Sequence, residues 1–78
     1  MIFLLDYDRS LGRLVSMATY QDNRLAEAQD ARLQLELELN RAGVSREVVL
    51  LEAANEEVLR RTHRRYFEDL TQLAESPK

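Results

Sequence analysis

The chain begins with a run of apolar residues, 2–7, that constrains the fold more than any other stretch. If this run is extended, its side chains point alternately to two sides, Ile2 and Leu4 to one and Phe3 and Leu5 to the other. A strand that is apolar on both sides is typical of one that is covered on both faces or paired at both edges. The run therefore predicts a central strand, around which the other elements must be arranged.

A second stretch with strand-favouring residues covers 14–20 and follows the first after a short connection. This connection contains Asp8, Ser10 and Gly12: the first two side chains can bond nearby backbone groups, and glycine accepts a positive φ. Two short strands separated by a Gly-containing turn are typical of a β-hairpin. Because polar residues interrupt the second stretch, its strand is expected at an edge of the sheet.

Residues 23–41 favour a helix because they are rich in Ala, Leu, Glu, Gln and Arg and contain neither Gly nor Pro. Four leucines alternate with polar residues there, which is the period of a strand. Leu, Gln and Glu nevertheless lack strand propensity, and the segment is long enough for about five helical turns. Asp22 is the expected N-cap of this helix, and Gly43 is the expected residue at its C-terminal end.

At helical spacing this segment carries two apolar stripes on nearly opposite sides. The wider stripe consists of Leu25, Ala28, Ala31, Leu35, Leu39 and Ala42. The second stripe consists of Ala26, Leu33 and Leu37. Because one apolar stripe is enough to pack a helix onto a sheet, we expect the second to be the interface of a homodimer. The alternative is that these leucines are simply exposed, which is common for single residues.

Residues 47–53 form a short apolar run that opens with the β-branched pair Val48 and Val49. These two residues favour a third strand. The period of so short a run does not exclude its alternative, a continuous helix over 45–73. In that case the chain would be a β-hairpin followed by two long helices.

The last predicted helix begins after Asn55, a favourable N-cap, with Glu56 and Glu57 in the first turn, where the helix dipole stabilises negative charge. Its apolar residues recur at helical spacing from Val58 through Tyr66 to Leu73. This regular spacing predicts one amphipathic helix that covers the sheet.

Together these segments predict an α+β fold in the order strand, strand, helix, strand, helix. The helix between the second and third strands implies a right-handed crossover. With the first strand in the centre, the result is a three-stranded mixed sheet of order 2-1-3, covered by two helices in two layers. Residues 1–75 are expected to form a single small domain, and 76–78 a frayed tail.

The length of 78 residues limits how stable such a domain can be. A chain of this size buries only about 60% of its unfolded surface. It has no cysteine and one histidine, which argues against disulfides and a protein-bound zinc ion, and no cofactor is expected. A second copy of the chain is therefore the expected source of further stability. The apolar start is too short for a signal peptide or a membrane span, so the expected location is the cytoplasm.

The densest basic cluster comprises Arg60, Arg61, Arg64 and Arg65, next to an aromatic pair. Such a pattern can bind nucleic acid through phosphate contacts and stacking. Each arginine, however, has an acid four positions away: Glu56, Glu57, Glu68 and Asp69. A helix surface whose charges pair with one another explains the cluster without a ligand. The net charge of −3 also gives no field that would attract nucleic acid, so another protein is the favoured partner for these arginines.

Two further positions have chemical potential. His63 falls at the border of the apolar stripe and is expected to pack its ring there, because no side chain is positioned to form a catalytic relay with it. Asp6 and Asp8 fall on one side of the first strand and could share a divalent metal. The pair Tyr7 and Asp8 is similar in position to the metal aspartate of a CRISPR-associated nuclease family, although a tight turn follows here where that family has a helix. Alternatively, Asp8 opens the hairpin turn.

The sequence thus predicts a small, non-enzymatic, homodimeric module that binds another protein. One alternative is a nucleic-acid-binding accessory protein that uses residues 60–65. The other is a metal-dependent nuclease that uses Asp6 and Asp8.

Overall fold

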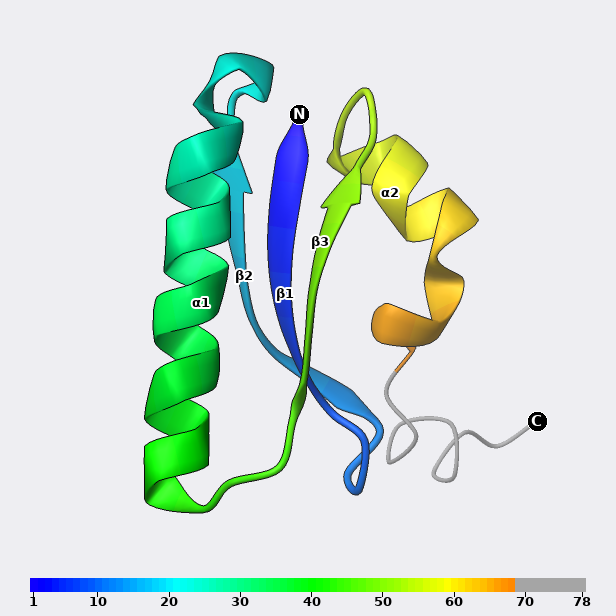
Figure 1. Cartoon of the computed structure of the whole chain (residues 1–78). Coiled ribbons are helices and arrows are strands. Elements are labelled where there is room, and N and C mark those ends of the chain that lie inside the picture. The colour runs from blue at the N-terminus through cyan, green and yellow to red at the C-terminus, as the bar shows by residue number, and fades with distance from the viewer. Residues whose placement is uncertain (69–78) are drawn as a thin grey trace, which may run out of the picture.

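A computed structural model describes residues 1–68 of the chain (Figure 1). Its elements are the strands β1 (Ile2–Asp8) and β2 (Arg13–Tyr20), the 3₁₀ helix η1 (Asp22–Arg24), helix α1 (Leu25–Ala42), strand β3 (Glu47–Glu52), helix α2 (Glu56–Thr62) and the 3₁₀ helix η2 (Arg64–Tyr66). This order confirms the predicted α+β fold, and strand β3 excludes the alternative of a long second helix. The predicted tail, 76–78, lies outside the described residues.

The three strands form a sheet of order β2-β1-β3, as predicted. Both ladders are antiparallel, so the sheet is antiparallel and not mixed. The strands β2 and β3 still run parallel to each other on either side of β1, as the crossover through α1 requires. A register shift between Asp6 and Tyr7 makes a bulge in the β1–β2 ladder.

The two helices lie on opposite faces of the sheet, which corrects the expected two-layer arrangement. Figure 1 shows the sheet nearly edge-on, with α1 on one side and α2 on the other. The reason is the two-sided apolar character of β1. Phe3, Leu5 and Tyr7 are buried against α2 and η2, so the alternating residues Ile2 and Leu4, which are also buried, belong to the face on the α1 side. Each apolar face of β1 needs its own cover, so the fold has three layers.

The larger core lies on the α2 side. Its buried members are Phe3, Leu5, Tyr7, Leu59 and Tyr66. Half-buried residues from the two outer strands pack against them, namely Leu14 and Met17 of β2 and Val49 and Leu51 of β3. Leu59 therefore attaches α2 and Tyr66 attaches η2 to the same face of the sheet.

Helix α1 packs on the other face through the middle of its wider stripe. Ala28 is fully buried, and Ala31, Leu35 and Leu39 are half-buried. The ends of the predicted stripe are not covered, since Leu25 is 44% exposed and Ala42 is also exposed. The contact is thus confined to the central turns, where two alanines allow a close approach to the strands.

The predicted C-terminal end of α1 is confirmed, whereas its predicted N-cap is wrong. Asp22 does not cap the helix, because its carboxylate pairs with the amino group of Met1 at 2.6 Å and α1 begins only at Leu25. At the other end Gly43 has φ 71°. Its N–H donates to the carbonyl of Asn40, and the next N–H, of Val44, donates to that of Leu39. These two bonds form a Schellman motif, which needs glycine's freedom at positive φ.

Helix α2 begins as predicted but ends earlier. The side chain of Asn55 accepts a hydrogen bond from the N–H of Val58 at 2.9 Å. The helix ends at Thr62, His63 leaves the helical conformation with φ −125° and ψ 53°, and η2 follows. The expected continuous helix is therefore broken after Thr62, and the part of it that was predicted for 69–73 lies beyond the described residues.

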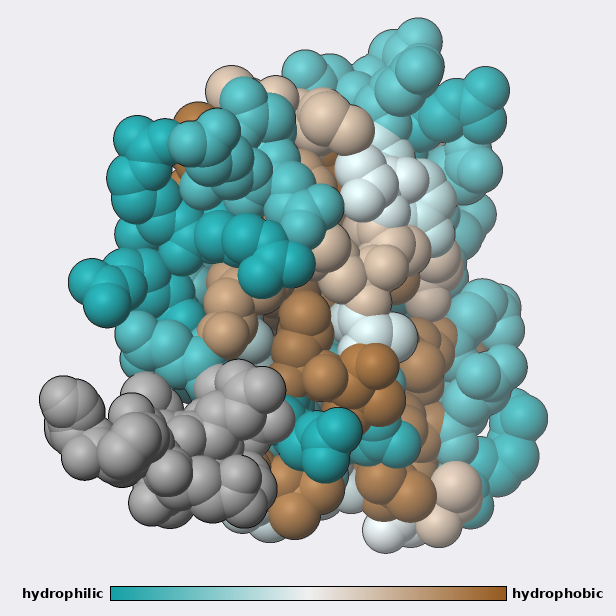
Figure 2. Space-filling model, turned by 180° about the vertical axis from the view of Figure 1, so that it is seen from behind, coloured by the Kyte–Doolittle hydropathy of each residue, from teal (hydrophilic) through white to brown (hydrophobic). Residues whose placement is uncertain are grey.

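The molecule is a slab that is thin in one direction, because its sheet is only three strands wide. The Cα positions extend over 43 × 34 × 12 Å. The outer strand β2 ends the sheet on one side, as predicted. Val15 of this strand is 48% exposed, and Leu11 of the hairpin turn is 54% exposed. Figure 2, seen from behind, shows apolar surface down the middle of the molecule between hydrophilic flanks.

Candidate functional site

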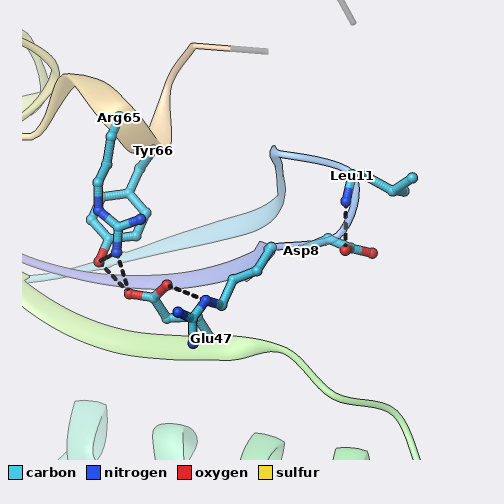
Figure 3. Close-up of polar contacts among 6 residues, drawn as sticks. Asp8, Leu11, Glu47, Arg65 and Tyr66 are labelled. Carbon is cyan, nitrogen blue, oxygen red and sulfur yellow. Dashed lines mark hydrogen bonds and ion pairs between the residues drawn. The ribbon is translucent and has the colours of Figure 1, made fainter. Parts of the chain in front are cut away.

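A polar cluster joins β3 to η2 on the α2 side of the sheet (Figure 3). Glu47 stands opposite Tyr7 in the β1–β3 ladder, so both side chains face η2. The hydroxyl of Tyr66 donates to Oε2 of Glu47 at 2.6 Å, and Nη2 of Arg65 donates to the same oxygen at 2.6 Å. Nη2 of Arg65 also donates to the Tyr66 hydroxyl at 2.9 Å. One carboxylate oxygen therefore receives two hydrogen bonds from neighbouring residues of η2.

The protonation of this cluster follows from these bonds. Donation by the Tyr66 hydroxyl, together with Arg65, holds the pKa of Glu47 below its ordinary value. Burial of the ring raises the pKa of Tyr66, and the adjacent Glu47 carboxylate adds to this effect. The bond to Glu47 raises the pKa of Arg65. At neutral pH the cluster therefore consists of a carboxylate, a neutral phenol and a guanidinium.

Aromatic rings support the same contact. The ring of Tyr66 meets that of Tyr7 edge-on, with centroids 5.2 Å apart and an interplanar angle of 88°. The guanidinium of Arg65 lies 4.3 Å from the Tyr66 centroid and 5.7 Å from the Tyr7 centroid. These cation–π contacts and the ion pair use the same guanidinium. We name Glu47, Arg65, Tyr66 and Tyr7 the clasp, because they fasten η2 to the sheet.

The four arginines of the basic cluster all have acidic partners. Three predicted pairs are present, Glu56–Arg60 at 2.8 Å, Glu57–Arg61 at 3.5 Å and Arg64–Glu68 at 3.3 Å. Arg65 is different: it binds Glu47 of β3, while its predicted partner Asp69 lies outside the described residues. Arg60 also stacks on the ring of Phe67 at 4.6 Å. Most of the basic charge is thus neutralised locally, and one arginine belongs to the clasp.

Thr62 and His63 contact each other at the end of α2, where His63 leaves the helical conformation. The Thr62 hydroxyl donates to the carbonyl of Val58 at 2.9 Å, and its oxygen lies 3.0 Å from Nδ1 of His63. Which of the two groups donates in this second contact depends on the tautomer of His63.

Asp6 and Asp8 are each engaged within the chain. Asp6 is only 5% exposed, and its Oδ2 accepts a hydrogen bond from Nη1 of Arg46 at 3.1 Å. Oδ1 of Asp8 accepts from the N–H of Leu11 at 3.0 Å, and this bond lowers the pKa of Asp8. Within residues 1–68, no group of three or more potential metal-binding side chains comes together. Asp8 opens the hairpin turn, and Asp6 anchors the loop before β3.

A shallow hollow of about 430 Å³ lies between the end of α1 and the start of β3. Its lining includes Leu39, Val44 and Val48, together with the charged side chains of Glu36 and Arg46. Glu36 already pairs with Arg32 at 3.8 Å, and Arg46 pairs with Asp6. The charged groups that line the hollow are therefore already paired within the chain.

The second stripe of α1 faces away from the sheet, as its spacing predicts. Leu33 is 52% exposed and Leu37 is 44% exposed, and Ala26 is also exposed. We name these three residues the outward stripe. Two large apolar side chains one helical turn apart, on the outer layer of the molecule, are suited to contact with another apolar surface.

No protein-family model, no curated protein and no solved structure matches this chain. In the part of the chain that the structure describes, no helix combines the length and the apolar character needed to cross a membrane.

The clasp is the feature that could not be found from sequence spacing. Glu47 is separated from Tyr66 by 19 positions, and the predicted pairs were restricted to residues four apart. In the sequence, Glu47 is only a glutamate that precedes four apolar residues of the strand. Its role is seen once the β1–β3 register places it opposite Tyr7.

Proposed function

We propose that this protein is a small, non-enzymatic interaction module that acts as a homodimer through the outward stripe of α1. The observation that carries this proposal is the pair Leu33 and Leu37, which are 52% and 44% exposed on the side of α1 opposite the sheet. A helix that packs on a sheet needs one apolar side, and α1 has two.

The size of the stripe fits a weak to moderate dimer. Full burial of a leucine contributes about 1.5–3 kcal/mol, from which the cost of association must be subtracted. A symmetric dimer buries the leucines of both copies, because a two-fold axis repeats each contact. The contact would also supply the stability that a three-stranded slab lacks.

The non-enzymatic part of the proposal is supported by side chains that are already occupied. The hydroxyl of Thr62 is directed to a carbonyl, the carboxylate of Asp6 binds Arg46, and that of Asp8 binds the hairpin turn. The local pairing of the basic cluster argues against nucleic acid. For a second protein, the surface we propose is that of Arg60, Arg61 and Arg64, whose side chains remain 53%, 67% and 74% exposed in spite of their ion pairs.

Sedimentation velocity tests the dimer. At about 100 μM, well above the roughly micromolar affinity expected of such a patch, the wild type should sediment as a dimer and Leu33→Glu/Leu37→Glu as a folded monomer. The matched control is Leu11→Glu/Val15→Glu, since these residues are equally apolar and are 54% and 48% exposed elsewhere. The control should remain dimeric. A wild type that is monomeric at this concentration would contradict the proposal.

A further inference from the structure

We propose that the two copies meet through antiparallel α1 helices, with Asp30 of each copy facing Arg41 of the other. The inference rests on the proposed function, because it requires the outward stripe to be the dimer contact. It goes further by fixing the direction of the two helices and the ion pairs between them.

The flanks of the outward stripe carry two different kinds of polar group. Successive residues of an α-helix are rotated by about 100°. This rotation places Asp30 and Arg41 along one flank of the stripe, and Gln29 and Asn40 along the other. All four residues are exposed. One flank therefore carries opposite charges at its two ends. The other carries two neutral amides, with Glu36, which pairs with Arg32, at its outer edge.

These residues are arranged nearly symmetrically about the level of Leu35. Leu33 and Leu37 are each two positions away, while Asp30 and Arg41 are five and six positions away. In an antiparallel pair with its two-fold axis at this level, Leu33 faces Leu37 of the other copy. Asp30 then comes within about 2 Å, along the helix axis, of the level of Arg41 of the other copy.

The charges on this flank are available for such pairs. Within residues 1–68, neither Asp30 nor Arg41 takes part in an ion pair, whereas Arg32 and Glu36 bind each other at 3.8 Å. Glu36 is thus already occupied by a residue of its own helix. A two-fold axis perpendicular to both helices keeps the charged flank of one copy on the same side as that of the other, so both Asp30–Arg41 pairs can form together.

A parallel arrangement lacks this complementarity. It would place Asp30 level with Asp30 of the other copy, and Arg41 level with Arg41. Residues eleven positions apart are separated by about 16 Å along a helix, beyond the screening length of about 8 Å at physiological salt. The opposite charges would then contribute little to association, so the pattern favours the antiparallel pair.

Charge reversal tests the arrangement. Asp30→Arg and Arg41→Asp should each weaken the homodimer about tenfold or more, because each places like charges opposite each other. A mixture of the two variants should form a heterodimer, which native mass spectrometry distinguishes by mass. The double variant Asp30→Arg/Arg41→Asp should again form a homodimer. Glu38→Arg is the matched control on the same helix, away from the charged flank, and should dimerise like the wild type.

A single cysteine gives a second readout, since the chain contains none of its own. In the antiparallel pair the two copies of Ala26 are about 27 Å apart along the helices, so Ala26→Cys should give no covalent dimer on oxidation. If the wild type is a dimer but Ala26→Cys also forms a covalent dimer, the antiparallel arrangement is wrong while the proposed function stands. The same conclusion follows if the charge-reversal variants show no preference for the mixed dimer. A monomeric wild type would instead overturn the proposed function.

Discussion

The hydroxyl of Tyr66 donates a 2.6 Å hydrogen bond to Glu47, a residue that lies 19 positions earlier in the chain. This bond connects η2 to the first residue of β3. Because α2 ends at Thr62, the position of the chain after it depends on this contact and on the packing of Tyr66 against Tyr7. The clasp is thus the main attachment of η2 to the sheet.

Two substitutions at Tyr66 separate the contribution of its hydroxyl to stability from that of its ring. Tyr66→Phe keeps the ring but removes the hydroxyl, with its bond to Glu47 and the bond it accepts from Arg65, and should lower the free energy of unfolding by about 1.5 kcal/mol, the lower end for a hydrogen bond to a charged group. Tyr66→Ala also removes a buried aromatic ring and should cost about 3–5 kcal/mol. Urea unfolding measures both. A loss below about 1 kcal/mol for Tyr66→Ala would show that the ring contributes little to the core.

The clasp also predicts how stability depends on pH. The pKa of Glu47 is depressed in the folded state, so its contribution is complete above its ordinary pKa of 4.5 and is lost as the pH falls through the folded value. The pKa of Tyr66 is raised, so its contribution is complete below 10.0 and is lost as the pH rises through the folded value. The clasp should therefore be fully effective between these two limits.

Tyr66→Phe provides the control for this pH dependence. It removes the main cause of the Glu47 shift and the phenol itself. The loss of stability below pH 4.5 should become shallower, and the loss above pH 10 that comes from Tyr66 should disappear. Equal pH profiles for wild type and variant, measured by urea unfolding across this range, would argue against the assigned roles.

The arginines of the basic cluster should differ in their effect on stability. Arg61 forms an exposed pair within α2, so Arg61→Ala should change stability by less than about 0.5 kcal/mol. Arg65 binds Glu47 at 2.6 Å and lies over two rings. Its side chain is 60% exposed, which reduces the value of the ion pair, and Arg65→Ala should cost about 1 kcal/mol. Equal effects in thermal or urea unfolding would show that Arg65 is an ordinary surface residue.

The buried carboxylate of Asp6 should depend on Arg46. The Asp6 side chain is 6% exposed, and the Arg46 side chain is 21% exposed. Arg46→Ala would leave a buried charge without its partner and should cost about 3 kcal/mol. Adding Asp6→Asn to Arg46→Ala should then restore part of the stability, because the amide is neutral. If the double variant unfolds at lower urea than Arg46→Ala, the ion pair does not have this role.

Local patterns predicted most of the fold correctly. The hairpin turn with Gly12, the cap by Asn55, the C-terminal Gly43 and the central position of β1 all follow from preferences of single residues or short runs. The exposed side of α1 likewise follows from helical spacing. These features are determined by interactions between neighbours in the sequence, so the sequence alone is sufficient to find them.

The predictions that are wrong concern features that depend on contacts between residues far apart in the sequence. Helical propensity continues past Thr62, but Tyr66 and Arg65 dock on Glu47 and Tyr7, and this tertiary contact overrides it. The Thr62 hydroxyl, bonded back to Val58, accompanies the break. The placement of the helices on two faces was implicit in the two apolar sides of β1, yet the element order alone did not determine it.

A dilution series followed by ¹⁵N–¹H NMR tests the central claim, that α1 joins two copies, most directly. Between about 500 and 5 μM, a range that brackets a micromolar to submillimolar affinity, concentration-dependent shifts should be confined to the outward side of α1, at Ala26, Asp30, Leu33, Leu37 and Arg41. Shifts centred instead on Val15 of β2, or spectra that do not change with concentration, would contradict it.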